Sequence, residues 1–96
     1  MTVKLKSGDV FDAEGVFKSR MYPSLFIYTH AFTMQQAAAI FADPEHIETI
    51  IVIDGEKKTI YSGFSELDSI SKAEIFTEHP DELFIWLNYS FDSEVK

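Results

Sequence analysis

Three histidines are the residues of this chain best suited to proton transfer or metal binding. They are His30, His46 and His79, and no two of them are close neighbours in the sequence. Locally formed metal sites space their ligands two to four residues apart, so that both face one ion. Cysteine is absent, which excludes thiolate catalysis and zinc sites built on cysteine. The sequence therefore predicts no metal site and no cofactor.

Carboxylates near a histidine or near each other are the next candidates for chemistry. Asp43, Glu45 and His46 follow a predicted helix, but acidic residues beside a proline are ordinary in turns, and further ligands would have to come from distant strands. Asp81 and Glu82 lie in a polar segment, where we expect solvated surface charge, whereas a catalytic carboxylate needs a protected cleft. We predict no catalytic residue.

The segment 63–67 half resembles a nucleophile elbow, because Ser65 follows Gly63 in a Gly-x-Ser pattern. The second glycine, which lets that strained turn pack tightly, is missing, and no α/β-hydrolase pattern surrounds it. The chain has four glycines, never clustered, which excludes a phosphate-binding loop. We expect that the protein is not an enzyme.

One short helix is predicted at about 33–42. Thr33 and Gln36 match a capping box, in which each side chain bonds the other residue's amide. An apolar stripe follows at helical spacing: Met34, Ala37, Ala38 and Phe41. Pro44 disfavours helical geometry at Asp43 and should end the helix. Because so short a helix is marginal in water, packing against a sheet must hold it.

Strands account for most of the remaining chain. We predict them at 2–6, 10–18, 25–29, 47–53, 58–64 with a bulged continuation over 65–71, and 83–91. Gly15 is expected to mark a bulge, and Asp54-Gly55 is a strong signal for a hairpin turn. The strands at 47–53 and 83–91 have apolar residues on both faces, which favours central positions in a sheet.

These elements predict an α+β domain, with a curled, mainly antiparallel sheet of about six strands and the helix packed on it. A partly closed barrel or a sandwich is the nearest alternative. At 96 residues, with 46% hydrophobic and 15% aromatic residues, the chain should fold as one domain, assigned to 1–92, before a charged tail at 93–96.

The net charge of -8 is concentrated in the second half of the chain. An acidic surface repels phosphates, so we expect no direct binding of nucleic acid. Solubility explains such charge most simply. The alternative is a small acidic, DNA-mimicking inhibitor of a host DNA-binding enzyme. That function requires a single exposed ridge of carboxylates: Glu45, Glu48, Glu56, Glu66, Asp68 and Glu74.

No apolar segment follows Met1, so we expect no secretory signal. Residues 21–42 lack charged side chains, but Pro23 and several polar residues interrupt the segment, so we predict no membrane span.

Apolar residues in turns suggest where the protein makes contacts. Met21 and Tyr22 stand beside Pro23, and Phe76 precedes a polar loop. Such residues often fold back over a sheet edge; exposed, they form a patch for another subunit or a partner protein. Met21, Tyr22 and Phe76 are the candidate interaction residues, with a protein partner or self-association expected and no small-molecule substrate.

Three segments carry a resemblance to a known group of proteins: 41–45, which contains Asp-Pro-Glu, the isoleucine-rich 47–54, and 61–71, which begins Tyr-Ser-Gly-Phe-Ser. Together, over about 33–71, they resemble small uncharacterised proteins encoded by bacteriophages and prophages. The resemblance implies a non-enzymatic structural role in virion or tail assembly through protein contacts, located in the virion or the host cytoplasm. It supplies no catalytic residues.

Overall fold

The structure is a computed structural model that describes residues 1–19, 24–72 and 82–89. Within these residues the chain forms eight strands and two short helices. The strands make two four-stranded sheets, and every pairing is antiparallel. The predicted α+β class and antiparallel pairing are confirmed, but the prediction of one sheet of about six strands is wrong.

The first sheet has the order β2-β1-β5-β6. Its strands are β1 (Thr2–Leu5), β2 (Val10–Asp12), β5 (Thr49–Asp54) and β6 (Lys57–Ser62). Gly55 has a φ of 63° in the turn between β5 and β6, which confirms the hairpin predicted from Asp54-Gly55. As predicted, β5 is central, because it pairs with both β1 and β6.

The second sheet has the order β3-β4-β8-β7. Its strands are β3 (Gly15–Lys18), β4 (Ser24–Thr29), β7 (Phe64–Lys72) and β8 (Leu83–Tyr89). The pairing of β7 with β8 contains two register shifts, so the strand and the bulge predicted over 65–71 are confirmed. The prediction that this strand continues the one at 58–64 is wrong, because Gly63, with a φ of 91°, separates β7 from β6, which belongs to the first sheet. Strand β8 is central, as predicted, but one of its faces is only half-buried.

The chain passes from the first sheet to the second between β2 and β3, where the sequence predicted one continuous strand at 10–18. Phe11 and Ala13 are buried in the core. Phe17 stands at the same alternate positions of the sequence, four residues after Ala13, but has 57% of its surface exposed. The side-chain alternation therefore changes face at this corner. A Cβ at Gly15 would lie 2.7 Å from Cε2 of Phe17, because the Phe17 ring lies over this glycine.

The predicted capping box starts α1 (Met34–Phe41): Thr33 N donates to Gln36 Oε1 at 3.0 Å, and Gln36 N donates to Thr33 Oγ1 at 3.2 Å. Pro44 does more than end this helix, since it begins α2 (Pro44–Ile47). The Asp43 carboxylate caps α2 by accepting from Glu45 N at 3.0 Å, and proline suits the first helical position because its missing N–H is not needed there.

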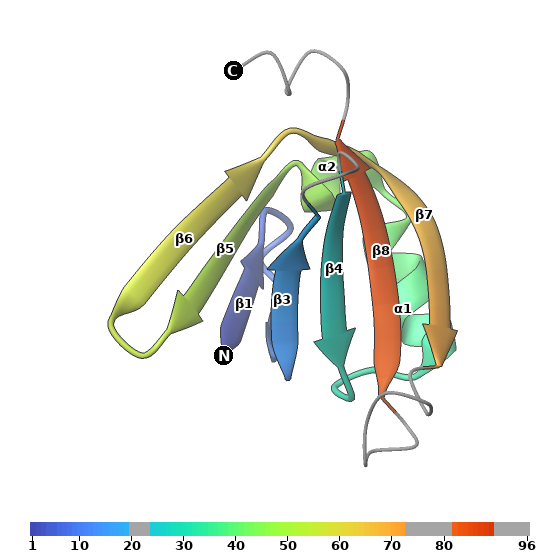
Figure 1. Ribbon diagram of the computed structural model, residues 1–96. Helices are drawn as coiled ribbons and strands as arrows, with labels where there is room; N and C mark the ends of the chain where they lie inside the picture. The colour runs from blue at the N-terminus through green and yellow to red at the C-terminus, as the bar shows by residue number, and fades with distance from the viewer. Residues whose placement is uncertain (20–23, 73–81, 90–96) are drawn as a thin grey trace.

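Both helices lie behind the second sheet in Figure 1, and the core fills the space between helices and sheets. Ala37 and Phe41 of the predicted helical stripe are buried, but Ala38 is exposed and Met34 has 41% of its surface exposed. Ile47 was predicted on a strand but is buried on α2. Neither helix in the described part of the chain is long and apolar enough to span a membrane.

Candidate functional site

Five aromatic side chains share the outer face of the second sheet. We call this set the aromatic face: Phe17, Phe26, Tyr28, Phe84 and Trp86. In the strand register Phe26 lies opposite both Phe17 and Trp86, and Tyr28 lies opposite Phe84. Their neighbours along β4 and β8 are buried in the core beside the helices. Because side chains alternate along a strand, the aromatic residues point away from the helices.

The rings of the aromatic face form one continuous chain of contacts. Phe17 meets Tyr28 with ring centroids 5.6 Å apart, and Tyr28 meets Phe84 at 5.0 Å. Phe84 stacks on Phe26 at 5.2 Å, and Phe26 meets Trp86 at 5.3 Å. Such pairs contribute about 0.5–1.5 kcal/mol each beyond the area they bury. These contacts join the five rings into one packed aromatic surface.

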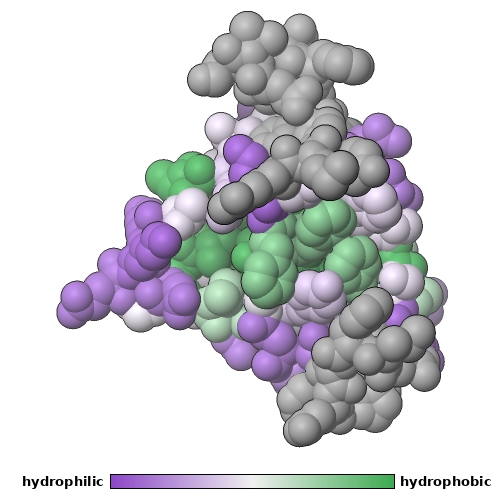
Figure 2. All heavy atoms as spheres, in the orientation of Figure 1, coloured by the Kyte–Doolittle hydropathy of each residue, from purple (hydrophilic) through white to green (hydrophobic). Residues whose placement is uncertain are grey.

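This surface remains open to solvent within the described structure. Phe17 is 57% exposed, and the other four side chains are half-buried. Figure 2 shows apolar residues gathered at the centre of the molecule, over the sheet strands and in view of the solvent. Contiguous apolar surface of this kind on a protein usually marks a contact site.

Hydrogen-bonded polar side chains border one end of the aromatic face. Ser24 Oγ donates to Asn88 Oδ1 at 2.7 Å, and Asn88 Nδ2 donates to Asp68 Oδ2 at 2.9 Å. These three residues lie on β4, β8 and β7, in neighbouring strands. The carboxylate of Asp68 gives this end negative charge.

The opposite end is bordered by Glu14, His30 and Glu82, the acid–histidine cluster. His30 Nδ1 lies 2.7 Å from Glu14 Oε1, and one ligand atom of each residue lies within 4.8 Å of the others. Glu82 is only 3% exposed, so the expectation that it is solvated surface charge is wrong. A buried carboxylate is costly unless polar or charged groups compensate it, which sets Glu82 apart from the surface carboxylates.

Tyr28 links the aromatic face to the acid–histidine cluster. Burial raises the pKa of the Tyr28 phenol, and the negative charge of Glu82 raises it further. The phenol therefore stays protonated at neutral pH and keeps its hydroxyl hydrogen. Tyr28 lies on β4 two residues before His30, so the cluster lies next to the aromatic face at this end of the sheet.

Trp86 provides a test of this surface that does not involve a partner. Its Nε1 is buried and has no hydrogen-bond acceptor in the described structure. Because an unsatisfied buried donor costs about 1–3 kcal/mol, Trp86→Phe should remove that cost while losing some apolar contact. We expect the free energy of unfolding, measured by circular dichroism in urea, to stay within about 1 kcal/mol of the parent value. A loss of several kcal/mol would show that the indole makes an essential contact.

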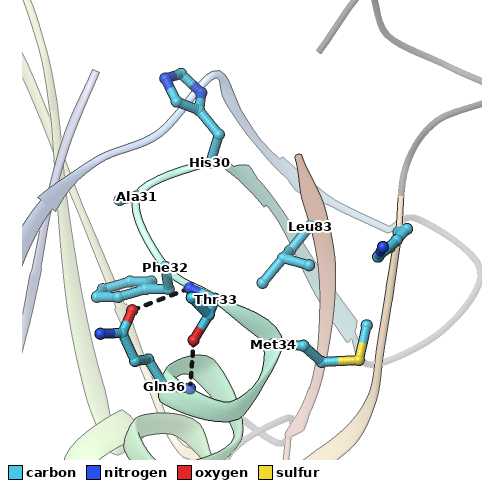
Figure 3. Close-up of a pocket in the computed structure, with 8 residues that line it drawn as sticks. His30, Ala31, Phe32, Thr33, Met34, Gln36 and Leu83 are labelled. Atoms are coloured by element: carbon cyan, nitrogen blue, oxygen red, sulfur yellow. Dashed lines mark hydrogen bonds between the residues drawn. The ribbon is translucent and has the colours of Figure 1, made fainter. Parts of the chain in front are cut away.

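A separate cavity of about 530 Å³ lies at the start of α1, lined by His30, Ala31, Phe32, Thr33, Met34, Gln36, Lys72 and Leu83. In Figure 3 the ring of His30 points away from Thr33 and Gln36. The amide and side-chain groups of Thr33 and Gln36 that meet here are already bonded to each other in the capping box. The cavity therefore shares His30 with the acid–histidine cluster, but the carboxylates of Glu14 and Glu82 do not line it.

Of the residues singled out from the sequence, the structure brings His30 and Glu82 together in the acid–histidine cluster. Met21, Tyr22, Phe76 and His79 lie outside the described residues. The structure uses Asp43 and His46 locally, since Asp43 caps α2 and His46 Nδ1 lies 2.9 Å from the carbonyl oxygen of Ile40.

The aromatic face and the cluster were both missed from the sequence. A local signal existed for the aromatic face: Phe26 and Tyr28 alternate with buried residues on β4, as Phe84 and Trp86 do on β8. The cluster had no such signal, because its three residues come from distant parts of the chain. Comparison of the chain with protein families, curated proteins and solved structures found no match.

Proposed function

We propose that this protein acts without catalysis, by binding another protein through the aromatic face. The observation that carries the proposal is the row of five ring side chains on a sheet face that neither helix covers. Aromatic residues dominate the binding energy of protein interfaces because they bury a large area and lose little side-chain entropy.

Charge selects the kind of partner. Carboxylates stand at both ends of the face, with Glu14 and Glu82 at one and Asp68 at the other. A second copy of the chain would bring like charges together in either orientation, and each copy has a net charge of -8. The partner we propose is therefore a different protein, with an apolar patch bordered by lysine or arginine. Its association should slow as ionic strength rises.

Phe17 and Ile60 provide a matched pair of variants for the test. Phe17 is 57% exposed on the aromatic face, and Ile60 is 59% exposed on β6 of the other sheet. A photo-crosslinking residue at position 17 should capture the partner, and the same residue at position 60 should not. With the captured protein purified, Phe17→Ala should weaken binding by about 10-fold or more, because the most exposed ring of the aromatic face is removed. Ile60→Ala should leave the affinity unchanged.

Two results would contradict this proposal. Equal losses of affinity in the Phe17 and Ile60 variants would place the contact elsewhere. A stable homodimer in light scattering, dispersed by Phe17→Ala, would replace the heterologous partner with a second copy of the chain.

On the resemblance to bacteriophage and prophage proteins alone, we propose that the partner is a component of virion or tail assembly. The crosslinking strain should therefore be an induced lysogen. Capture of a virion protein through position 17 supports this placement, and capture of only host proteins contradicts it.

The DNA-mimic alternative receives no support from the arrangement of the carboxylates. Glu45 lies on α2, Glu56 lies in the turn between β5 and β6, and Glu66 lies on β7. In Figure 1 the turn between β5 and β6 lies at the opposite end of the first sheet from α2 and from the start of β7. Glu48 is further occupied by Lys6, whose Nζ donates to Glu48 Oε2 at 2.6 Å. A phosphate-like ridge needs these groups in line, so we do not propose this function.

A further inference from the structure

We propose that Glu14, His30 and Glu82 bind a divalent transition-metal ion at the end of the second sheet. The inference does not depend on the proposed partner, because it concerns the isolated chain. Three neighbouring strands bring the ligands together: Glu14 immediately precedes β3, His30 immediately follows β4, and Glu82 immediately precedes β8. All three strand ends lie at the lower end of the sheet in Figure 1.

The distances suit an ion after small side-chain movements. Two ligands of a tetrahedral ion, each about 2.1 Å from it, lie about 3.4 Å apart. In the structure His30 Nδ1 and Glu14 Oε1 are 2.7 Å apart, and the whole set lies within 4.8 Å. The side chains of His30 and Glu14 are 49% and 37% exposed, so they have room to adjust by these amounts. The buried Glu82 supplies the fixed ligand.

The donor set indicates which ions fit. One imidazole nitrogen and two carboxylate oxygens are ligands for zinc and similar transition metals, whereas magnesium prefers oxygen ligands and retains several waters. With a neutral imidazole, the two carboxylates carry a charge that a divalent cation balances. Three protein ligands leave a coordination position for water or for a side chain of another molecule.

Zinc titration of the full chain, after treatment with chelator, tests the site. Calorimetry should show one zinc ion per chain, and zinc should raise the melting temperature. In NMR spectra the ring resonances of His30 should shift on addition of zinc, and those of His46 should not. Glu14→Gln and His30→Gln should each weaken zinc binding by about 10-fold or more, since changes even to outer-shell residues cost 10–100-fold.

The chain contains a matched control for these variants. His46 Nε2 and Asp43 Oδ2 form a second imidazole–carboxylate pair, 3.5 Å apart. Asp43→Asn should leave zinc binding unchanged. Glu14 and His30 are partly exposed, so their variants should fold, and circular dichroism in chelator checks this. In Glu82→Gln the buried charge is removed, so zinc should no longer raise the melting temperature even if the chelated variant is as stable as the parent.

Three outcomes would overturn the site. The first is the absence of any zinc-dependent heat or melting shift, which would reduce the cluster to an ion pair. The second is zinc binding that survives Glu14→Gln and His30→Gln but is lost in Asp43→Asn. The third is magnesium binding as tight as zinc binding, which would show that the His30 imidazole is not a ligand, because magnesium prefers oxygen ligands.

Discussion

Replacing Phe41 with alanine should lower the free energy of unfolding by about 3–5 kcal/mol, the usual cost of a large cavity in a core. Phe41 is fully buried at the end of α1. Its ring centroid lies 6.0 Å from that of Phe11 and 6.3 Å from that of Phe32, so one side chain ties the helix to β2 and to the helix's own leading segment. Urea denaturation followed by circular dichroism measures the loss.

Met34 is the control for this substitution, because it belongs to the same apolar stripe but has 41% of its surface exposed. Met34→Ala should cost less than about 1 kcal/mol, since little apolar area leaves the core. Equal losses in the two variants would mean that the stripe packs along its whole length, contrary to the observed burial.

Replacing Thr29 with valine should lower the free energy of unfolding by about 1–3 kcal/mol, because two hydrogen bonds of a buried hydroxyl to partly buried backbone groups are lost. Thr29 is fully buried at the end of β4. Its hydroxyl donates to the carbonyl oxygen of Asp12 at 2.7 Å and accepts from the amide of Ala31 at 3.1 Å. The bond to Asp12 connects β4 of the second sheet to the last residue of β2 in the first sheet.

Thr29→Ser keeps the hydroxyl and loses one methyl group, so it should recover part of the stability lost in Thr29→Val. Thr59→Val on β6 is a second control, since no hydrogen bond is seen for the Thr59 side chain in the described structure and valine favours strands. Thermal unfolding of the four proteins in parallel makes the comparison. If Thr29→Val were as stable as the parent, the two hydrogen bonds of the hydroxyl would make no net contribution to the free energy of unfolding.

Features set by neighbouring residues were predictable from the sequence. The capping box at Thr33, the Asp54-Gly55 hairpin and the central position of β8 all follow from local spacing and alternation. The start of α2 was also readable, because Asp43 followed by Pro44 is a typical cap and first position of a helix. That signal was interpreted only as the end of α1.

Features set by distant residues were not predictable. Phe11, Ala13, Gly15 and Phe17 stand at every second position, and this spacing predicted one strand through the corner where the chain changes sheets. Glu14, His30 and Glu82 meet only because β3 pairs with β4 and β4 pairs with β8, and the sequence does not encode that register in any local pattern. The prediction of no metal site therefore rested on local spacing alone, and zinc titration will decide it.

The central place of β8 has a consequence for synthesis of the protein. Strands β4 and β7 are both made before β8 and each pairs with it, so the second sheet lacks its middle until residues 83–89 leave the ribosome. Pairing of β1 with β5 likewise joins residues far apart in the chain. Such long loops slow folding and leave unpaired strand edges exposed on the nascent polypeptide. The second sheet therefore cannot form before β8 is made, and until then the strands that pair with it remain open to aggregation.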